Sequence, residues 1–130
     1  MTGTLLQFKA LYDGNAALMA ALPGGFFAVE ARQEPPGAYA IYYPIGGSAR
    51  YTAGEEILEE CGMTIMAISR TAGLAEMANI ETKLKAVFDN TEPGDATRRY
   101  IIRRATVPRI QYLEQAWHMW VDYNVMMHPL

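Results

Sequence analysis

Residues 112–127 have the sequence YLEQAWHMWVDYNVMM, in which large apolar side chains alternate with polar ones. An alternation with a period of two residues is typical of a β-strand that is buried on one face only. The apolar face consists of Leu113, Trp117, Met119, Val121, Tyr123 and Val125. The other face carries Glu114, His118, Asp122 and Asn124, with Trp120 among them. The pattern is too long to be accidental and predicts a long closing strand.

The segments before this strand predict a mixture of helix and sheet. Residues 98–107 are expected to form the preceding strand. Leu74–Phe88 is expected to be a helix, because its apolar residues recur at helical spacing opposite charged ones. Residues 57–70 alternate with a period of two and predict another strand. Residues 26–32 and 38–43 are rich in aromatic and β-branched residues, which favours two neighbouring strands.

The N-terminal part of the chain predicts two short helices, at residues 5–12 and 16–22. Thr4 and Gln7 have the spacing of a capping box at the start of the first helix. Residues 44–54 contain three glycines and no sustained apolar pattern, so we expect a long, mobile connection there.

These elements together predict an α+β fold, with a largely antiparallel sheet of four to five strands and helices packed on one face. The chain has 130 residues, of which 51% are hydrophobic, and residues 1–130 are expected to form a single domain. Helices on one face leave the second face of the sheet uncovered, and this face requires an explanation.

The charge of the chain argues against a general nucleic-acid binder, because 11 basic and 14 acidic side chains give a net charge of −3. The charges are unevenly distributed along the sequence. Residues 1–97 carry 6 basic and 12 acidic side chains, whereas residues 98–130 carry 5 basic and 2 acidic ones. Such asymmetry suits electrostatic pairing between two copies of the chain.

The single cysteine, Cys61, excludes a disulfide within the chain and suits a reducing cytoplasm. No apolar run approaches the roughly 20 residues that a membrane-spanning helix needs. We expect no secretory signal either, because the apolar residues 16–22 do not follow a basic segment.

Cys61, His118 and Asp122 are the residue types of a nucleophile, a base and an orienting acid. On one strand, however, His118 and Asp122 lie about 13 Å apart at ~3.3 Å per residue, far beyond hydrogen-bond reach. We therefore expect Cys61 to be a small buried apolar residue and predict no catalytic site.

An acidic cluster of four glutamates, Glu55, Glu56, Glu59 and Glu60, has the oxygen ligands that a hard cation prefers. It lacks the alternating Asp and Asn ligands and the turn glycine of a dedicated loop. We therefore favour a solvated loop end or a set of partners for arginines on another copy, and we predict no metal and no cofactor.

The basic residues of the last third are Arg98, Arg99, Arg103, Arg104 and Arg109. On a strand, Arg99 and Arg103 point to one face and Arg98 and Arg104 to the other. Splitting the cluster disfavours a nucleic-acid groove and favours salt bridges to the acidic half of a neighbouring copy.

Trp120 is a large aromatic residue among polar neighbours, so it marks either local packing under a loop or the anchor of a protein interface. The uncovered sheet face favours the interface. The candidate interface residues are therefore Trp120, His118, Arg99, Arg103, Arg104, Glu55, Glu56, Arg50 and Tyr51.

The order of these parts resembles the tail-terminator and tail-completion proteins of long-tailed bacteriophages, including the lambda-type terminator. The resemblance covers almost the whole chain. It is carried by interrupted N-terminal helices that end at Leu22, Pro23 and Gly24, by the strand 38–43 after Pro35 and Pro36, by the glycine-containing connection, by the strand 63–70, by the helix 74–88 and by the closing strand 117–126.

The resemblance implies a structural virion protein without enzymatic activity, assembled in the host cytoplasm. Such proteins form a ring, usually of six copies, that caps the head-proximal end of the tail tube and ends tube growth. The implied partners are further copies of the chain, the major tail tube protein and a head–tail connector or stopper. DNA only passes through the lumen of the ring, and no membrane is involved. Compared with larger terminators, the connection at residues 44–54 is shorter than an elaborated hairpin arm.

Two alternatives remain open at this point. The chain can be a connector or stopper of the neck, which docks on the portal side instead. From a different class, it can be a small hydrolase that uses Cys61 and His118, or a metal-dependent one that uses the glutamates.

Overall fold

A computed structural model describes residues 2–31, 35, 37–52, 55–70 and 73–129, with only the backbone described for residues 2, 47–52 and 55–58. Within these residues the chain forms helices α1 (Thr2–Asp13), α2 (Ala16–Ala21) and α3 (Leu74–Phe88). The strands are β1 (Gly25–Ala28), β2 (Tyr39–Thr52), β3 (Glu55–Ser69), β4 (Arg98–Arg104), β5 (Arg109–Leu113) and β6 (Ala116–Pro129).

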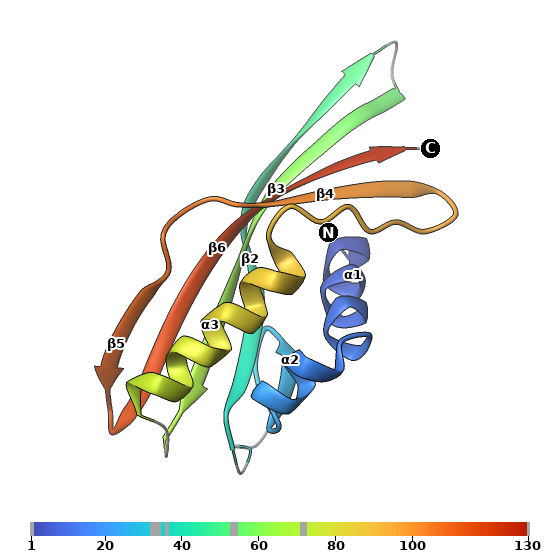
Figure 1. Cartoon of the computed structure of the whole chain (residues 1–130). Helices are drawn as coiled ribbons and strands as arrows, with labels where there is room; N and C mark the ends of the chain where they lie inside the picture. The colour runs from blue at the N-terminus through green and yellow to red at the C-terminus, as the bar shows by residue number, and fades with distance from the viewer. Residues whose placement is uncertain (1, 32–34, 36, 53–54, 71–72, 130) are drawn as a thin grey trace.

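The strands form one sheet in which β6 is paired along both edges (Figure 1). β3 pairs with one edge of β6, while β5 pairs with the first half of its other edge and β4 with the second half. β2 follows β3, and β1 pairs with β2 in parallel. The α+β class is confirmed. Instead of a largely antiparallel sheet of four to five strands, however, the described residues form a mixed sheet of six strands.

The parallel pair results from the connection that follows β1. Val29 has a φ of 68°, and β1 ends at Ala28 rather than at the predicted residue 32. The chain then returns to the same end of the sheet, so that Gly25 lies opposite Tyr39 and Ala28 lies opposite Tyr42. A tight turn would have placed the two strands antiparallel.

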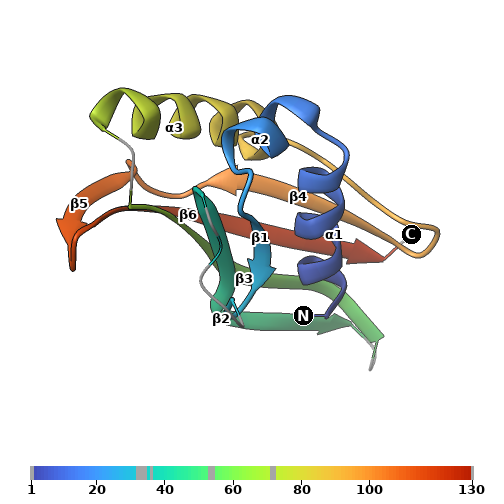
Figure 2. The same ribbon diagram turned by 90° about the horizontal axis from the view of Figure 1, so that it is seen from below.

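The helices lie on one face of the sheet, as predicted, and the sheet curls around them (Figure 2). The apolar stripe of α3 is buried against the sheet. Aromatic rings from four elements meet in the core between the layers: the ring centroids of Phe8 and Phe88 are 5.0 Å apart, and those of Phe26 and Tyr42 are 4.5 Å apart. This core also contains Met119, Val121, Tyr123, Val125 and Met127 from alternate positions of β6.

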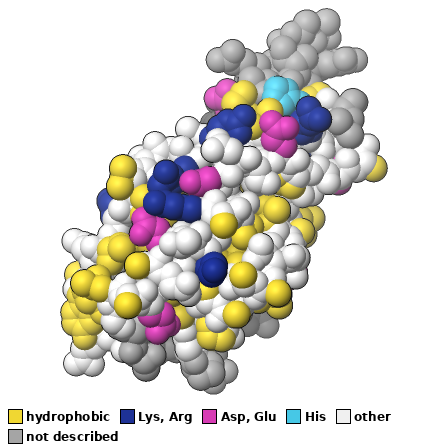
Figure 3. Space-filling model, viewed as in Figure 1, with side chains coloured by type: hydrophobic (Ala, Val, Ile, Leu, Met, Phe, Trp, Pro, Cys, Tyr) yellow, Lys and Arg dark blue, Asp and Glu magenta, His cyan; other side chains and the backbone are white. Residues whose placement is uncertain are grey.

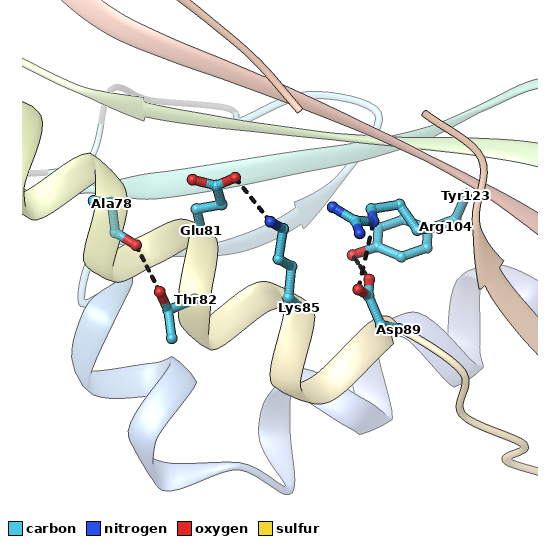
Figure 4. A network of polar contacts seen from close by, with 7 residues as sticks. All are labelled: Ala78, Glu81, Thr82, Lys85, Asp89, Arg104 and Tyr123. Atoms are coloured by element: carbon cyan, nitrogen blue, oxygen red, sulfur yellow. Dashed lines mark hydrogen bonds and ion pairs between the residues drawn. The ribbon is translucent and has the colours of Figure 1, made fainter. Parts of the chain in front are cut away.

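A polar contact joins the end of α3 to two strands (Figure 4). The Tyr123 hydroxyl donates to Asp89 Oδ1 at 3.1 Å, and Arg104 Nε lies 3.4 Å from Asp89 Oδ2. Burial and the neighbouring Asp89 charge raise the pKa of the Tyr123 phenol above its ordinary value of 10.0. The same figure shows the pairs Thr82–Ala78 and Lys85–Glu81, which lie on α3 itself.

Residues 44–54 differ from the prediction. β2 continues to Thr52, and the second half of β2 pairs with β3 as far as Glu55, with a register shift between Pro44 and Gly46. Residues 46–52 and 55–60 therefore form a hairpin arm rather than an irregular connection. The main-chain hydrogen bonds to β3 impose an extended conformation that the glycines do not favour by themselves.

The closing run also differs from the prediction, because it consists of two strands. Glu114 and Gln115 have φ values of 51° and 62° and form a two-residue turn between β5 and β6. Such turns usually contain Asn-Gly or Asp-Gly, so this one gave no signal. Leu113 consequently lies outside the core and is 43% exposed. The preceding strand ends at Arg104 instead of residue 107.

The predicted capping box is wrong as well. α1 begins at Thr2, and Thr4 is buried inside it, where its hydroxyl donates to Met127 Sδ at 3.2 Å. This contact ties α1 to the end of β6.

The packing of the core predicts that the same leucine-to-alanine change will affect stability very differently at a buried and at an exposed helix position. Leu84→Ala removes a side chain that is 0% exposed and should lower the free energy of unfolding by about 2–5 kcal/mol. Leu6→Ala, at a side chain that is 65% exposed, should change it by less than about 0.5 kcal/mol. Urea denaturation followed by circular dichroism measures both. Equal losses would contradict the described packing.

Alkaline pH should destabilise the fold through Tyr123. Its pKa is higher in the folded than in the unfolded chain, so its stabilising effect is complete below pH 10.0 and is lost as the pH rises above that value. Above this pH the free energy of unfolding should fall by up to about 1.4 kcal/mol per pH unit through this group. Tyr123→Phe should reduce the slope without abolishing it, because burial also raises the pKa of Tyr12, Tyr42 and Tyr100. Denaturation series across this pH range test the difference.

Candidate interaction surface

The uncovered face of the sheet carries a row of side chains that crosses five strands. Phe27 of β1 lies opposite Ile41, Ile41 opposite Met66, and Met66 opposite Trp120. Trp120 in turn lies opposite Arg109 of β5, at the edge of the sheet. The four apolar members of the row are half-buried. A smaller apolar cluster on this face contains Tyr39, Ile68 and Ala116. The face is therefore predominantly apolar in this part, although no helix covers it.

Trp120 is contacted by two neighbouring side chains, His118 and Arg109. The imidazole of His118 stacks on the indole, with ring centroids 5.6 Å apart and planes at 16°. The guanidinium carbon of Arg109 lies 5.7 Å from the centroid of the indole ring. His118 is itself oriented by a contact of 3.1 Å between Nδ1 and the carbonyl oxygen of Ala116. These contacts favour one orientation of the indole, and restricting a side chain in this way reduces the entropy that binding costs.

A hollow of about 440 Å³ lies beside Trp120 at the edge of β5 and is lined by Arg109, Ile110, Gln111 and Trp120. Further along the same face, the Thr64 hydroxyl donates to Asp122 Oδ1 at 2.7 Å, so this carboxylate has a partner within the sheet. The uncovered face therefore combines an apolar row with one positive charge, that of Arg109, at the β5 edge.

The predicted arginines occupy both faces of β4, as their spacing indicated. Arg99 and Arg103 lie opposite His128 and Asn124 of β6 and share the uncovered face. Arg103 is 3.9 Å from Glu92, Arg104 is 3.4 Å from Asp89, and Arg98 is 3.7 Å from Glu59. Three of these arginines therefore have ion-pair partners in their own chain. Pairs as exposed as Arg103–Glu92 contribute little stability and can exchange partners at low cost.

The other predicted interface residues lie in the hairpin arm. Arg50 is opposite Leu58, Tyr51 opposite Glu56, and Glu55 opposite Thr52. Their side chains are outside the described residues. The fold brings these four together at the end of the arm, whereas Trp120 and His118 lie on the part of β6 next to β5.

Cys61, His118 and Asp122 do not converge. Cys61 is buried in the core on the helix-covered face, whereas His118 and Asp122 belong to the opposite face. Burial raises the pKa of the Cys61 thiol, which disfavours the reactive thiolate. Among the described residues, no three His, Cys, Asp or Glu side chains gather closely enough to hold a metal ion. The described helices include none with the length and apolar character needed to cross a membrane.

Sequence reasoning missed one feature, which is the exposed apolar edge at β5. Val107, Ile110, Tyr112 and Leu113 are 80%, 37%, 57% and 43% exposed. Figure 3 shows yellow side chains gathered at the lower left, where β5 and the start of α3 lie. The only sequence signal was the polar pair Glu114 and Gln115 inside an otherwise apolar run.

No protein-family model matches the sequence, and no curated protein matches it either. The structure is similar to one chain in the solved virion of a native gene transfer agent particle, with a TM-score of 0.76. The same fold therefore occurs in a virion. The match covers 92% of this chain and 90% of that chain at 11% sequence identity. An identity this low shows a shared fold and nothing more.

The burial of Cys61 predicts a thiol that does not react in the folded chain. At about pH 8, a chromogenic disulfide reagent should label Cys61 slowly in the native protein and rapidly after unfolding in urea. Absorbance measures the rate. Fast labelling of the native chain would instead support an activated thiol.

Proposed function

We propose that the chain is a structural virion protein that forms a closed ring on the head-proximal end of a phage tail tube. The observation that carries this proposal is the fold, which matches a chain of a virion particle over nearly its whole length. In this role the ring ends tube polymerisation and presents a surface for joining to the head connector.

The uncovered sheet face supports a role in assembly. The apolar row contains Trp120 stacked on His118, and no described helix covers it. This composition is that of an interface core, which is enriched in aromatic residues and Met. The main core lies on the helix-covered face, and the row lies outside it. We therefore assign this face to contacts with other virion components.

The hairpin arm supports the same role. Beyond the pairing of Glu59 with Met127, β2 and β3 continue as a two-stranded ribbon. A two-stranded ribbon is only marginally stable in water unless something packs against it. A neighbouring copy or the tube supplies that support in a ring.

The difference between the two ends of the molecule supports a ring. The arm and β5 lie at opposite ends of the sheet (Figure 1), so a contact between them is heterologous. Heterologous contacts close into rings when the rotation between copies permits it. We propose a hexamer with the tube protein on one side, a connector or stopper on the other, and a lumen for DNA.

Imaging of particles tests the assignment. Particles made without this chain should carry tails of uncontrolled length, because nothing ends tube growth. Tails of normal length that fail to join heads would identify a neck connector or stopper instead. A chain found outside the tail–head junction, or a turnover abolished by Cys61→Ala with assembly intact, would refute the proposal.

Replacing Trp120 provides a prediction in solution. Trp120→Ala should weaken ring formation by about 2 kcal/mol or more, because aromatic anchors of this kind dominate interface energies. Trp117→Ala is the matched control, since this tryptophan packs on the helix-covered face. The control should lower the stability of the subunit and affect association less. Analytical ultracentrifugation over a concentration series measures association, and an unchanged mass distribution for Trp120→Ala would count against the surface.

A further inference from the structure

The outer edge of β5 is left open, in contrast to the edge of β4. The edge of β4 is covered by the segment before it, because Thr91 and Ile102 exchange main-chain hydrogen bonds and Tyr100 N donates to Pro93 O at 2.8 Å. β5 pairs with β6 only, and the described residues supply no strand on its other side. Natural proteins protect such edges with charges, prolines or bulges. Within β5, the only protective feature of this kind is the charge of Arg109, at the first position of the strand.

The main-chain groups that point outward from β5 can be identified from its turn. In a two-residue hairpin the pair that closes the turn is hydrogen-bonded, and here this pair is Leu113 with Ala116. Hydrogen-bonded pairs alternate along the strands, so Gln111 and Arg109 also turn their main-chain groups towards β6. Ile110 and Tyr112 therefore direct their N–H and C=O groups away from the sheet, ready to pair with another strand.

The hairpin arm has a second open edge. β1 pairs with β2 only from Tyr39 to Tyr42, and the remainder of β2 has no described partner on that side. Near the start of this portion, Pro44 and a register shift blunt the edge, so the available part begins at Gly46. β2 and β6 are both antiparallel to β3, whereas β5 is antiparallel to β6. β5 and β2 consequently run in opposite directions and can pair antiparallel.

Charge favours the arm of a second copy as the strand that β5 accepts. Arg109 lies on the uncovered face at the β5 edge, and Glu60 lies on the same face of β3, opposite Ser48. Neither side chain has an ion-pair partner among the described residues. The arm residues 47–60 carry one basic and four acidic side chains. When the sheets of two copies join edge to edge with their uncovered faces on the same side, Arg109 of one copy and Glu60 of the other lie on that same face.

The distance across the arm fits the reach of both side chains. Between Arg109 of one copy and Glu60 of the next lies one strand, β2, so their backbones are about 10 Å apart. The intervening residues 46–49 are Gly, Gly, Ser and Ala, which are too small to block an arginine. A long arginine and a glutamate together span this distance.

We propose that the open edge of β5 in one copy pairs antiparallel with the edge of β2 at residues 46–48 in the next copy, with Arg109 opposite Ser48 and therefore facing Glu60. This inference rests on the proposed ring, because it names the contact that closes it. The sheet of each subunit then continues into its neighbour, and main-chain hydrogen bonds hold the base of the arm.

Two substitutions at one position test the main-chain part of the contact. Ile110→Pro removes an outward N–H, which lies opposite Gly47 of the next copy, without removing a hydrogen bond to β6, and edge strands tolerate this change. Ile110→Ala is the matched control, because it removes the same side chain and keeps the N–H. We expect association of the proline variant to be at least about tenfold weaker than that of the alanine variant. Equal association, with both subunits folded by circular dichroism, overturns the inference.

A charge exchange tests the identity of the partner strand. Arg109→Glu and Glu60→Arg should each weaken association by about tenfold, and the double variant should recover it, because every contact then contains the exchanged pair. Single variants that associate as the wild type does overturn the inference. The inference is also overturned if Arg109→Glu weakens association and Glu60→Arg does not. That result indicates that β5 pairs with β5 or with another protein.

The mass of the wild-type chain separates the two proposals. A wild-type ring that tolerates all of these substitutions overturns the β5 contact and leaves the proposed function standing. A wild-type chain that stays monomeric at about millimolar concentration also overturns the contact. The proposed function fails in addition only when imaging finds no collar at the tail–head junction.

Discussion

The pairing of β6 along both of its edges is the constraint on which the rest of the structure depends. Its main-chain groups bond to β3 on one side and to β5 and then β4 on the other. Its alternate side chains, among them Val121 and Val125, are fully buried against the helix layer. Because the alternation has a period of two, fixing one face in the core also fixes what the other face presents. Trp120 and His118 are therefore displayed as a consequence of burying their neighbours.

The helix layer determines which face becomes available for contacts. α3 buries its apolar stripe on the sheet, and the bond between Tyr123 and Asp89 ties its end to β6. α1 is tied to the same strand through Thr4 and Met127. With the helices held on one side, no described helix covers the row from Phe27 to Trp120 (Figure 2). One face of the sheet is covered by helices and the other is available for contacts. This arrangement suits a subunit whose second face is covered by neighbouring subunits, which is the role that we propose.

Part of the candidate surface could be predicted from the sequence. The position of Trp120 among polar residues indicated an aromatic side chain on the uncovered face, and the division of the β4 arginines between two faces followed from their spacing. The ion pairs of Arg98, Arg103 and Arg104 within the chain could not be predicted, because their partners are distant or lie on another element. The open β5 edge was missed for the same reason. An edge exists only once the neighbours of a strand are known.

The sequence by itself determined the α+β class, the helix Leu74–Phe88 and the buried face of the closing strand, because local periodicity specifies these features. Only the tertiary structure decided that β1 runs parallel to β2, that residues 44–52 extend a strand, and that the closing run turns at Glu114 and Gln115. In each of these cases the local sequence is compatible with more than one backbone path. The hydrogen bonds that select one path come from strands elsewhere in the chain, so no stretch read alone contains the answer.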